Sequence, residues 1–136
     1  MHDLRLNHVT LGAIDMAASV LFYRRLGLTL IVDAAPRYVR FEFPETRSSG
    51  EPATLSLHEV TSDWIAPKDW PLIYFEVNDV AAYLSEISVE PLHAPELKSY
   101  AWEEADVVDP SGNRLRIFKA GSVRRFPDWR IDSRQS

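Results

Sequence analysis

The sequence predicts an α+β fold in which two βαβββ modules pair around an open, β-barrel-like cleft. The main observation is an internal repeat. A strand-like segment, an aspartate and an amphipathic helix occur twice, with Asp15 and Asp79 lying 64 positions apart. The second observation is that further strand-like segments follow each helix. Repeats of this length indicate a doubled structural unit, and we expect equivalent positions to face each other across a pseudo-symmetric cleft.

The first module, about residues 4–60, opens with a strand and a helix. Residues 5–11 are rich in β-forming side chains and predict the strand. Asp15 is a favourable N-cap, and Gly27 is a suitable residue to end the helix. The apolar stripe expected to face the core consists of Met16, Val20, Leu21, Tyr23 and Leu26.

Three strands complete this module, at residues 28–32, 38–43 and 53–58. The polar segment 44–52 holds Ser48, Ser49 and Gly50, which predict a hairpin loop. Residues 61–71 contain two tryptophans and two prolines and are interpreted as the linker between the modules.

The second module, about residues 72–119, repeats this order. Residues 72–77 predict a strand, and Asp79 caps a helix with apolar residues at helical spacing. Strands are expected near 89–94, 101–108 and 113–119, with a tight turn at 109–113. We treat 1–120 as one domain. The tail, residues 121–136, carries Phe126 and Trp129, and we expect it to dock on this domain or on a partner subunit.

Composition excludes several classes of protein. The chain has 136 residues, 46 % of them hydrophobic, which indicates a globular protein. Its net charge of −5 argues against a nucleic-acid or anionic-membrane partner. It has no cysteine, which rules out disulfides and thiol chemistry and fits a reducing compartment. The sequence shows no apolar leader and no membrane span, so we expect a cytoplasmic protein.

One face of the predicted sheets is too polar for a sealed core and too aromatic for a plain solvent face. We interpret it as a ligand-facing surface. The residues expected on this surface are His8, Thr10, Tyr38, Ser56, His58, Leu72, Tyr74, Glu76, Trp102, Arg114, Arg116 and Phe118.

These segments resemble the vicinal oxygen chelate superfamily, the group of glyoxalase I, bleomycin-resistance proteins and extradiol dioxygenases. The resemblance rests on residues 6–11, Asp15 and 22–28 in the first module, and on 75–80 and 109–115 in the second. It covers about residues 4–119. It specifies the fold well and the reaction poorly, because folds of this kind host several functions.

In the metal-dependent members, each module gives two ligands to one divalent ion. The resemblance places these four positions at His8, Ser56, Leu72 and Arg116, so only His8 is retained. Leucine donates nothing and a guanidinium repels a cation, so we expect no cofactor. A rearranged site would use His8, His58 and Glu76, and would hold Fe, Zn, Ni or Mn.

Three functions remain open. The first is metal-independent binding of a compact aromatic or anionic molecule, as in bleomycin-resistance proteins. The second is a metalloenzyme with a displaced site that uses His8 and His58, either a glyoxalase-type lyase or a dioxygenase-type oxidoreductase. The third is a metal-free enzyme in which His8 acts as the base and Arg116 stabilises an oxyanion.

Individual residues also have two interpretations each. Arg116 either holds a ligand's carboxylate or phosphate group, or forms an internal ion pair with Glu76 or Glu42. Tyr38, Tyr74, Trp102 and Phe118 either form walls for a planar ligand or simply pack the sheets. His93, beside Pro91 and Pro95, is expected in a loop or an edge strand and does not indicate a function. The resemblance implies a homodimer, in which the cleft belongs to one chain or is shared between two.

Overall fold

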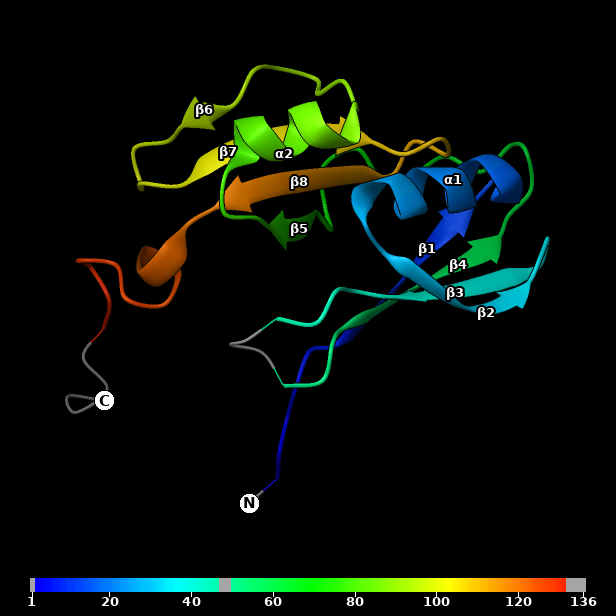
Figure 1. Ribbon diagram of the computed structural model, residues 1–136, viewed down its shortest axis with the longest axis horizontal. Helices are drawn as coiled ribbons and strands as arrows, with labels where there is room; N and C mark the ends of the chain where they lie inside the picture. The colour runs from blue at the N-terminus through cyan, green and yellow to red at the C-terminus, as the bar shows by residue number, and fades with distance from the viewer. Residues whose placement is uncertain (1, 47–49, 132–136) are drawn as a thin grey trace. The chain divides into compact units, whose positions relative to one another are not determined.

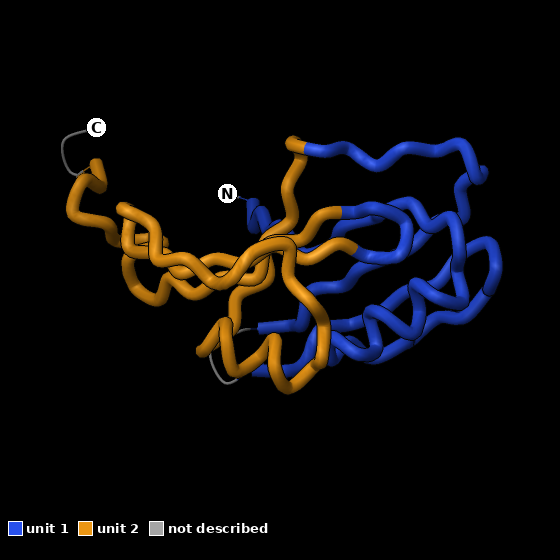
Figure 2. The backbone as a smooth tube through the Cα atoms, turned by 90° about the horizontal axis from the view of Figure 1, so that it is seen from above, with its two compact units in different colours: residues 1–68, 109–113 blue, residues 69–108, 114–136 orange. Residues whose placement is uncertain are grey.

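The computed structural model describes residues 2–46 and 50–131, and it divides into two compact units. Unit 1 contains residues 1–68 and 109–113, and unit 2 contains 69–108 and 114–136 (Figure 2). The boundary at residue 68 falls inside the expected linker. Of the predicted hairpin loop at Ser48, Ser49 and Gly50, the first two residues lie outside the described residues.

Unit 1 is a four-stranded mixed sheet covered on one face by a helix (Figure 1). The strand order is β1-β4-β3-β2, with β1 parallel to β4 and the other neighbours antiparallel. Tyr23 of the helix packs against Phe41 of the sheet, and both are fully buried. The elements are β1 (His8–Ala13), α1 (Met16–Leu26), β2 (Thr29–Ala34), β3 (Tyr38–Glu42) and β4 (Thr54–Glu59).

Unit 2 repeats the plan with the strand order β5-β8-β7-β6, and β5 runs parallel to β8. The elements are β5 (Ile73–Glu76), α2 (Val80–Ile87), β6 (Glu96–Leu97), β7 (Glu103–Val108), β8 (Arg114–Lys119) and the short 3-10 helix η1 (Gly121–Arg124). The doubled βαβββ architecture is therefore confirmed. Among the described residues, no helix is long and apolar enough to cross a membrane.

The two aspartates that defined the repeat cap their helices as expected. The Asp15 Oδ1 atom accepts a hydrogen bond from the Ala18 N–H at 3.0 Å, and the Asp79 Oδ1 atom accepts one from the Ala82 N–H at 2.9 Å. Gly27 ends α1 in the left-handed conformation, with φ of 109°. Both helix beginnings were thus readable from the sequence.

Two predicted details are wrong. Leu21 is 65 % exposed and does not belong to the core stripe of α1. Ser19 is buried instead, and its hydroxyl is satisfied by donating to the Asp15 carbonyl at 2.7 Å. The strand expected near 89–94 lies at 96–97 instead. Pro91 and Pro95 have no N–H group, so that segment cannot sustain a ladder.

The turn 109–113 lies with unit 1 and is held by a buried aspartate. The Asp109 Oδ1 atom accepts from the N–H groups of Ser111 and Asn113, both at 2.9 Å. The Tyr23 hydroxyl donates to the Asp109 Oδ2 atom at 2.7 Å, and the Asn113 side chain donates to the Gly12 carbonyl at 2.8 Å. These bonds fix the turn against α1 and β1.

Candidate functional site

The sheet face of unit 1 opposite α1 carries a row of polar side chains. Parallel pairing sets His8 beside Thr54 and Thr10 beside Ser56. Antiparallel pairing sets Arg40 beside Ser56. Because side chains two residues apart share a face of a strand, His8, Thr10 and Ser56 come together as expected, and they are joined by Thr54 and Arg40, which were not among the expected residues.

His8 is held by three hydroxyl groups. Its Nδ1 atom lies 2.6 Å from the Thr54 Oγ1 atom. Its Nε2 atom lies 3.2 Å from the Ser56 Oγ atom and 3.3 Å from the Thr10 Oγ1 atom. No described side chain that contacts His8 is a carboxylate, so the imidazole is oriented by neutral groups.

The polar row continues from His8 to Arg40. The Ser56 Oγ atom lies 2.5 Å from the Tyr38 hydroxyl, which accepts a hydrogen bond from the Arg40 Nε atom at 2.8 Å. The hydrogen bond with Ser56, followed by that from Arg40 and its charge, lowers the pKa of the Tyr38 phenol. Ser56 is fully buried, whereas the His8 and Tyr38 side chains that it connects are exposed and half-buried.

His58 lies on the same sheet face but not beside His8. Its register partner in β1 is Gly12, four residues beyond His8, a separation of about 13 Å along the strand. The His58 ring instead packs edge-on against Tyr38, with ring centroids 4.9 Å apart. The two histidines therefore do not form the paired ligands of a displaced metal site. Gly12 itself contacts the Trp64 ring from the linker.

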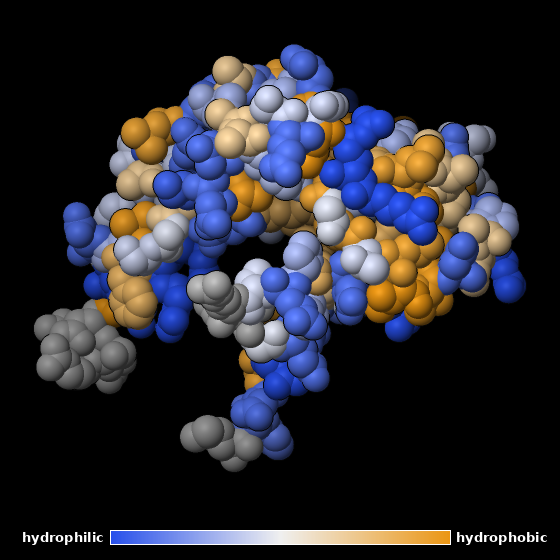
Figure 3. Space-filling view, viewed as in Figure 1, coloured by the Kyte–Doolittle hydropathy of each residue, from blue (hydrophilic) through white to orange (hydrophobic). Residues whose placement is uncertain are grey.

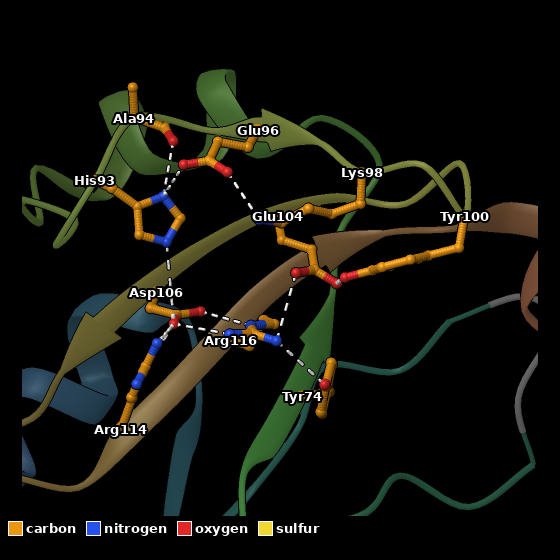
Figure 4. A network of polar contacts seen from close by, with 10 residues as sticks. All are labelled: Tyr74, His93, Ala94, Glu96, Lys98, Tyr100, Glu104, Asp106, Arg114 and Arg116. Carbon is orange, nitrogen blue, oxygen red and sulfur yellow. Dashed lines mark hydrogen bonds and ion pairs between the residues drawn. The ribbon is translucent and has the colours of Figure 1, made fainter. Parts of the chain in front are cut away.

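In unit 2, Arg116 is occupied by a buried carboxylate rather than free for a ligand (Figure 4). Its Nε atom donates to the Asp106 Oδ1 atom at 2.7 Å, and its Nη2 atom donates to the Oδ2 atom at 3.0 Å. Arg114 also donates to Asp106. Burial would raise the pKa of Asp106, but the bonds from Arg116 and Arg114 outweigh it, so the pKa is lowered.

Glu104 is the second buried acid in this network. Its Oε2 atom accepts from the Tyr100 hydroxyl at 2.7 Å, and its Oε1 atom lies 3.4 Å from the Arg116 Nη1 atom without forming a hydrogen bond. Burial, followed by the bond to Glu104, raises the pKa of Tyr100 to about 12. His93 borders the network, with its Nε2 atom 4.0 Å from Asp106 Oδ2.

Of the two interpretations of Arg116, the internal ion pair is the one that the structure shows, but the predicted partners were wrong. Glu104 and Asp106, not Glu76 or Glu42, hold the guanidinium. Sequence reasoning missed both acids. The signal was the alternation of Glu104 and Asp106 with Ala105 and Val107, which sets the two carboxylates on the polar face of β7.

Aromatic side chains form a wall beside this network. Trp102 stacks on Phe118 with ring centroids 5.0 Å apart, and Tyr74 meets both rings edge-on. We call Tyr74, Trp102 and Phe118 the aromatic wall. A cavity of about 240 Å³ opens at the wall. It is lined by Tyr74, Tyr100, Trp102, Glu104, Val123, Arg124, Pro127 and Trp129.

Glu76 binds the first residues of the tail that follows β8. Its Oε2 atom accepts from the N–H groups of Ala120 and Gly121, at 2.9 and 3.0 Å. Its Oε1 atom lies 3.8 Å from the Arg124 Nε atom. These contacts hold the start of η1 against β5, which brings tail residues to the rim of the aromatic cavity.

The residues at the four positions that the family resemblance assigns to metal ligands do not suit a divalent ion. Among these four, only His8 offers an imidazole nitrogen to a metal ion. The Ser56 hydroxyl is hydrogen-bonded to Tyr38, and the Leu72 side chain has no donor atom. At the fourth position a guanidinium neutralises buried acids. Within residues 2–46 and 50–131, no group of three His, Cys, Asp or Glu side chains is arranged to hold a metal ion.

Comparison with known proteins supports the fold. The model of the Glyoxalase/Bleomycin resistance protein/Dioxygenase superfamily matches residues 5–117. A comparison with curated protein sequences finds no match.

Several solved structures are similar to this chain. Lactoylglutathione lyase from Agrobacterium tumefaciens has 18 % identity over 85 % of this chain and 93 % of its own, with a TM-score of 0.64. A bleomycin resistance determinant encoded on the transposon Tn5 has 18 % identity over 87 % and 99 %, with a TM-score of 0.63. A bleomycin-binding protein complexed with bleomycin has 20 % identity over 87 % and 99 %, with a TM-score of 0.59.

Proposed function

Because the chain belongs to the glyoxalase/bleomycin resistance protein/dioxygenase superfamily, we propose that it binds a small organic molecule in the aromatic cavity, without a metal ion. The observation that carries this proposal is the cavity itself. Four of its lining side chains are aromatic, namely Tyr74, Tyr100, Trp102 and Trp129. Aromatic side chains bind the ring of a planar ligand favourably by offset stacking or by edge-to-face contact.

The size and the chemistry of the cavity narrow the ligand. At about 240 Å³, it is smaller than the roughly 300–1,000 Å³ of sites for drug-sized molecules. A one- or two-ring compound suits this space. The support for metal independence is the donor set, since Leu72 and Arg116 stand where two ligands would be needed.

Ligand-observed NMR with a library of one- and two-ring compounds tests the proposal. We expect binders whose affinity falls about fivefold or more in Trp102→Leu, since stacking of a base on an aromatic side chain contributes about 1–3 kcal/mol. Trp70→Leu is the matched control, because Trp70 is 76 % exposed and does not line the cavity. A library without binders, or equal losses in both variants, contradicts the proposal.

A second candidate function, metal-free proton transfer in unit 1, has one observation in its favour. Hydroxyl contacts of 3.2 and 2.5 Å connect the His8 imidazole to Tyr38 through Ser56. Ultraviolet titration of Tyr38 tests the coupling. We expect Ser56→Ala to move the Tyr38 pKa upward, since this hydrogen bond is the main cause of its lowering. An unchanged titration would remove the support for this function.

We also propose that the protein forms a homodimer, as the family resemblance implies. The support is exposed apolar surface on unit 1, where Leu21 is 65 % and Ile31 is 45 % exposed. Figure 3 shows hydrophobic residues gathered on one side of this unit, over β2 and its neighbouring strands. Sedimentation should give twice the chain mass of 15.5 kDa, and Ile31→Lys should lower it. A 15.5 kDa species for the wild type at tens of micromolar contradicts the dimer.

A further inference from the structure

A cluster of basic side chains in unit 1 surrounds Tyr38, at the far end of the polar row that begins at His8. We call Arg37, Arg40 and His58 the basic cluster. Together with Ala34 and Tyr38 they line a surface hollow. We propose that this hollow binds an oxyanion, namely the carboxylate or phosphate group of a small molecule. The inference stands apart from the proposed function, because the aromatic cavity lies in unit 2.

The strand register places the cluster. Tyr38 of β3 pairs with His58 of β4 on one side and with Ala34 of β2 on the other. Arg40 lies two residues beyond Tyr38, so the two side chains share a face of β3. Three neighbouring strands therefore present Ala34, Tyr38, Arg40 and His58 at one place, and Arg37 joins them from the turn between β2 and β3.

Tyr38 orients the Arg40 guanidinium. The Arg40 Nε atom donates to the Tyr38 hydroxyl at 2.8 Å, and the guanidinium carbon lies 5.4 Å from the centre of the Tyr38 ring. The bond uses the Nε–H group and leaves the two terminal amino groups for another acceptor. A guanidinium held in this way loses less side-chain entropy when it binds a planar oxyanion bidentately.

Nothing within the described residues neutralises the two arginines. No described carboxylate lies within ion-pair distance of Arg37 or Arg40. The inward arginines of β8 are different, since Arg114 and Arg116 both bond to the buried Asp106. The chain thus supplies a buried acid for the two arginines of β8, whereas Arg37 in its exposed turn and Arg40 on β3 have no described ion-pair partner.

The charge of the whole protein strengthens this contrast. With a net charge of −5, the chain has more carboxylates than it needs to pair every cation. Two arginines and a histidine gathered without an acid therefore form a local positive region in an acidic protein. Such a region attracts a small anion and favours bidentate hydrogen bonds to it.

Titration with inorganic phosphate and with malonate, each at constant ionic strength set by chloride, tests the site by NMR of the arginine Nε–H groups and histidine rings. We expect saturable shifts at Arg40 and His58. We also expect Arg40→Gln to weaken binding about tenfold or more, since a hydrogen bond to a charged group contributes about 1.5–3 kcal/mol. Arg40→Lys keeps the positive charge but loses the planar guanidinium group. Its affinity for the oxyanion should therefore lie between those of the wild type and Arg40→Gln.

Arg25→Gln is the matched control, because Arg25 is an exposed arginine on α1 of the same unit. Its binding should equal that of the wild type. Near-UV circular dichroism verifies that each variant keeps its fold. Saturation by phosphate alone or by malonate alone supports the site and identifies the preferred oxyanion. Shifts that are linear for both probes, or equal losses in Arg40→Gln and Arg25→Gln, overturn the proposal.

Discussion

Replacing Arg116 by methionine tests whether this position is structural. The change removes two hydrogen bonds to Asp106, of 2.7 and 3.0 Å, and an ion contact of 3.4 Å to Glu104. Hydrogen bonds to charged groups contribute about 1.5–3 kcal/mol each, but terms within one network do not add. Arg114 still bonds to Asp106. We therefore expect Arg116→Met to lower the free energy of unfolding by about 3 kcal/mol. This is the lower end of the roughly 3–5 kcal/mol lost when one partner of a buried ion pair is removed.

The pH dependence gives the experiment a second readout. The folded-state pKa of Asp106 is lowered, so its contribution to stability is present above the unfolded pKa of about 3.9 and is lost as pH falls through the folded value. The difference between wild type and Arg116→Met should thus be full at pH 7 and shrink in acid. Urea unfolding at pH 7 and at acid pH measures this difference in the free energy of unfolding. Arg25→Met is the exposed control. A loss below about 1 kcal/mol at pH 7 would refute the structural role, since that is the range of surface ion pairs.

Three further substitutions test other parts of the structure. Tyr23→Phe removes the buried bond to Asp109 and should cost about 1–3 kcal/mol. Because burial raises the pKa of Tyr23, urea unfolding should show this cost in full below pH of about 10 and show it fading in stronger alkali. Gly12→Ala sets a Cβ atom 2.9 Å from the Trp64 ring and should cost about 1–3 kcal/mol, with a changed near-UV spectrum. An unchanged spectrum contradicts that contact. Glu76→Gln weakens the cap on the tail and should speed tryptic cleavage after residue 124, whereas equal rates would mean that other contacts hold the tail.

The sequence predicted the parts of the fold that depend on local signals. Asp15 and Asp79 cap their helices by bonds to residues three positions on, which pattern alone can indicate. The doubled βαβββ plan follows from that repeat. The short strand at 96–97 was misplaced because only Glu96 and Leu97 pair with β7, and the residue pattern does not mark so short a strand.

The candidate site was less predictable, because its meaning depends on pairing between strands. The sequence places Arg116 on the polar face but does not show that Asp106 lies directly opposite it. Arg40 drew no attention for the same reason, since its contact with Tyr38 and its lack of a described acid partner appear only in three dimensions. The residue types indicate which side chains lie on the polar face of each sheet. The strand register then determines which arginines are paired with an acid and which can bind a ligand.

The central claim is that ligand binding in the aromatic cavity needs no metal ion. Its most direct test is the affinity of the best aromatic binder, measured by tryptophan fluorescence before and after exhaustive chelation, with metal analysis of the same samples. We expect equal affinities, with no effect of added Fe, Zn, Ni or Mn. Binding that disappears on chelation and returns with one equivalent of a divalent ion would contradict the account.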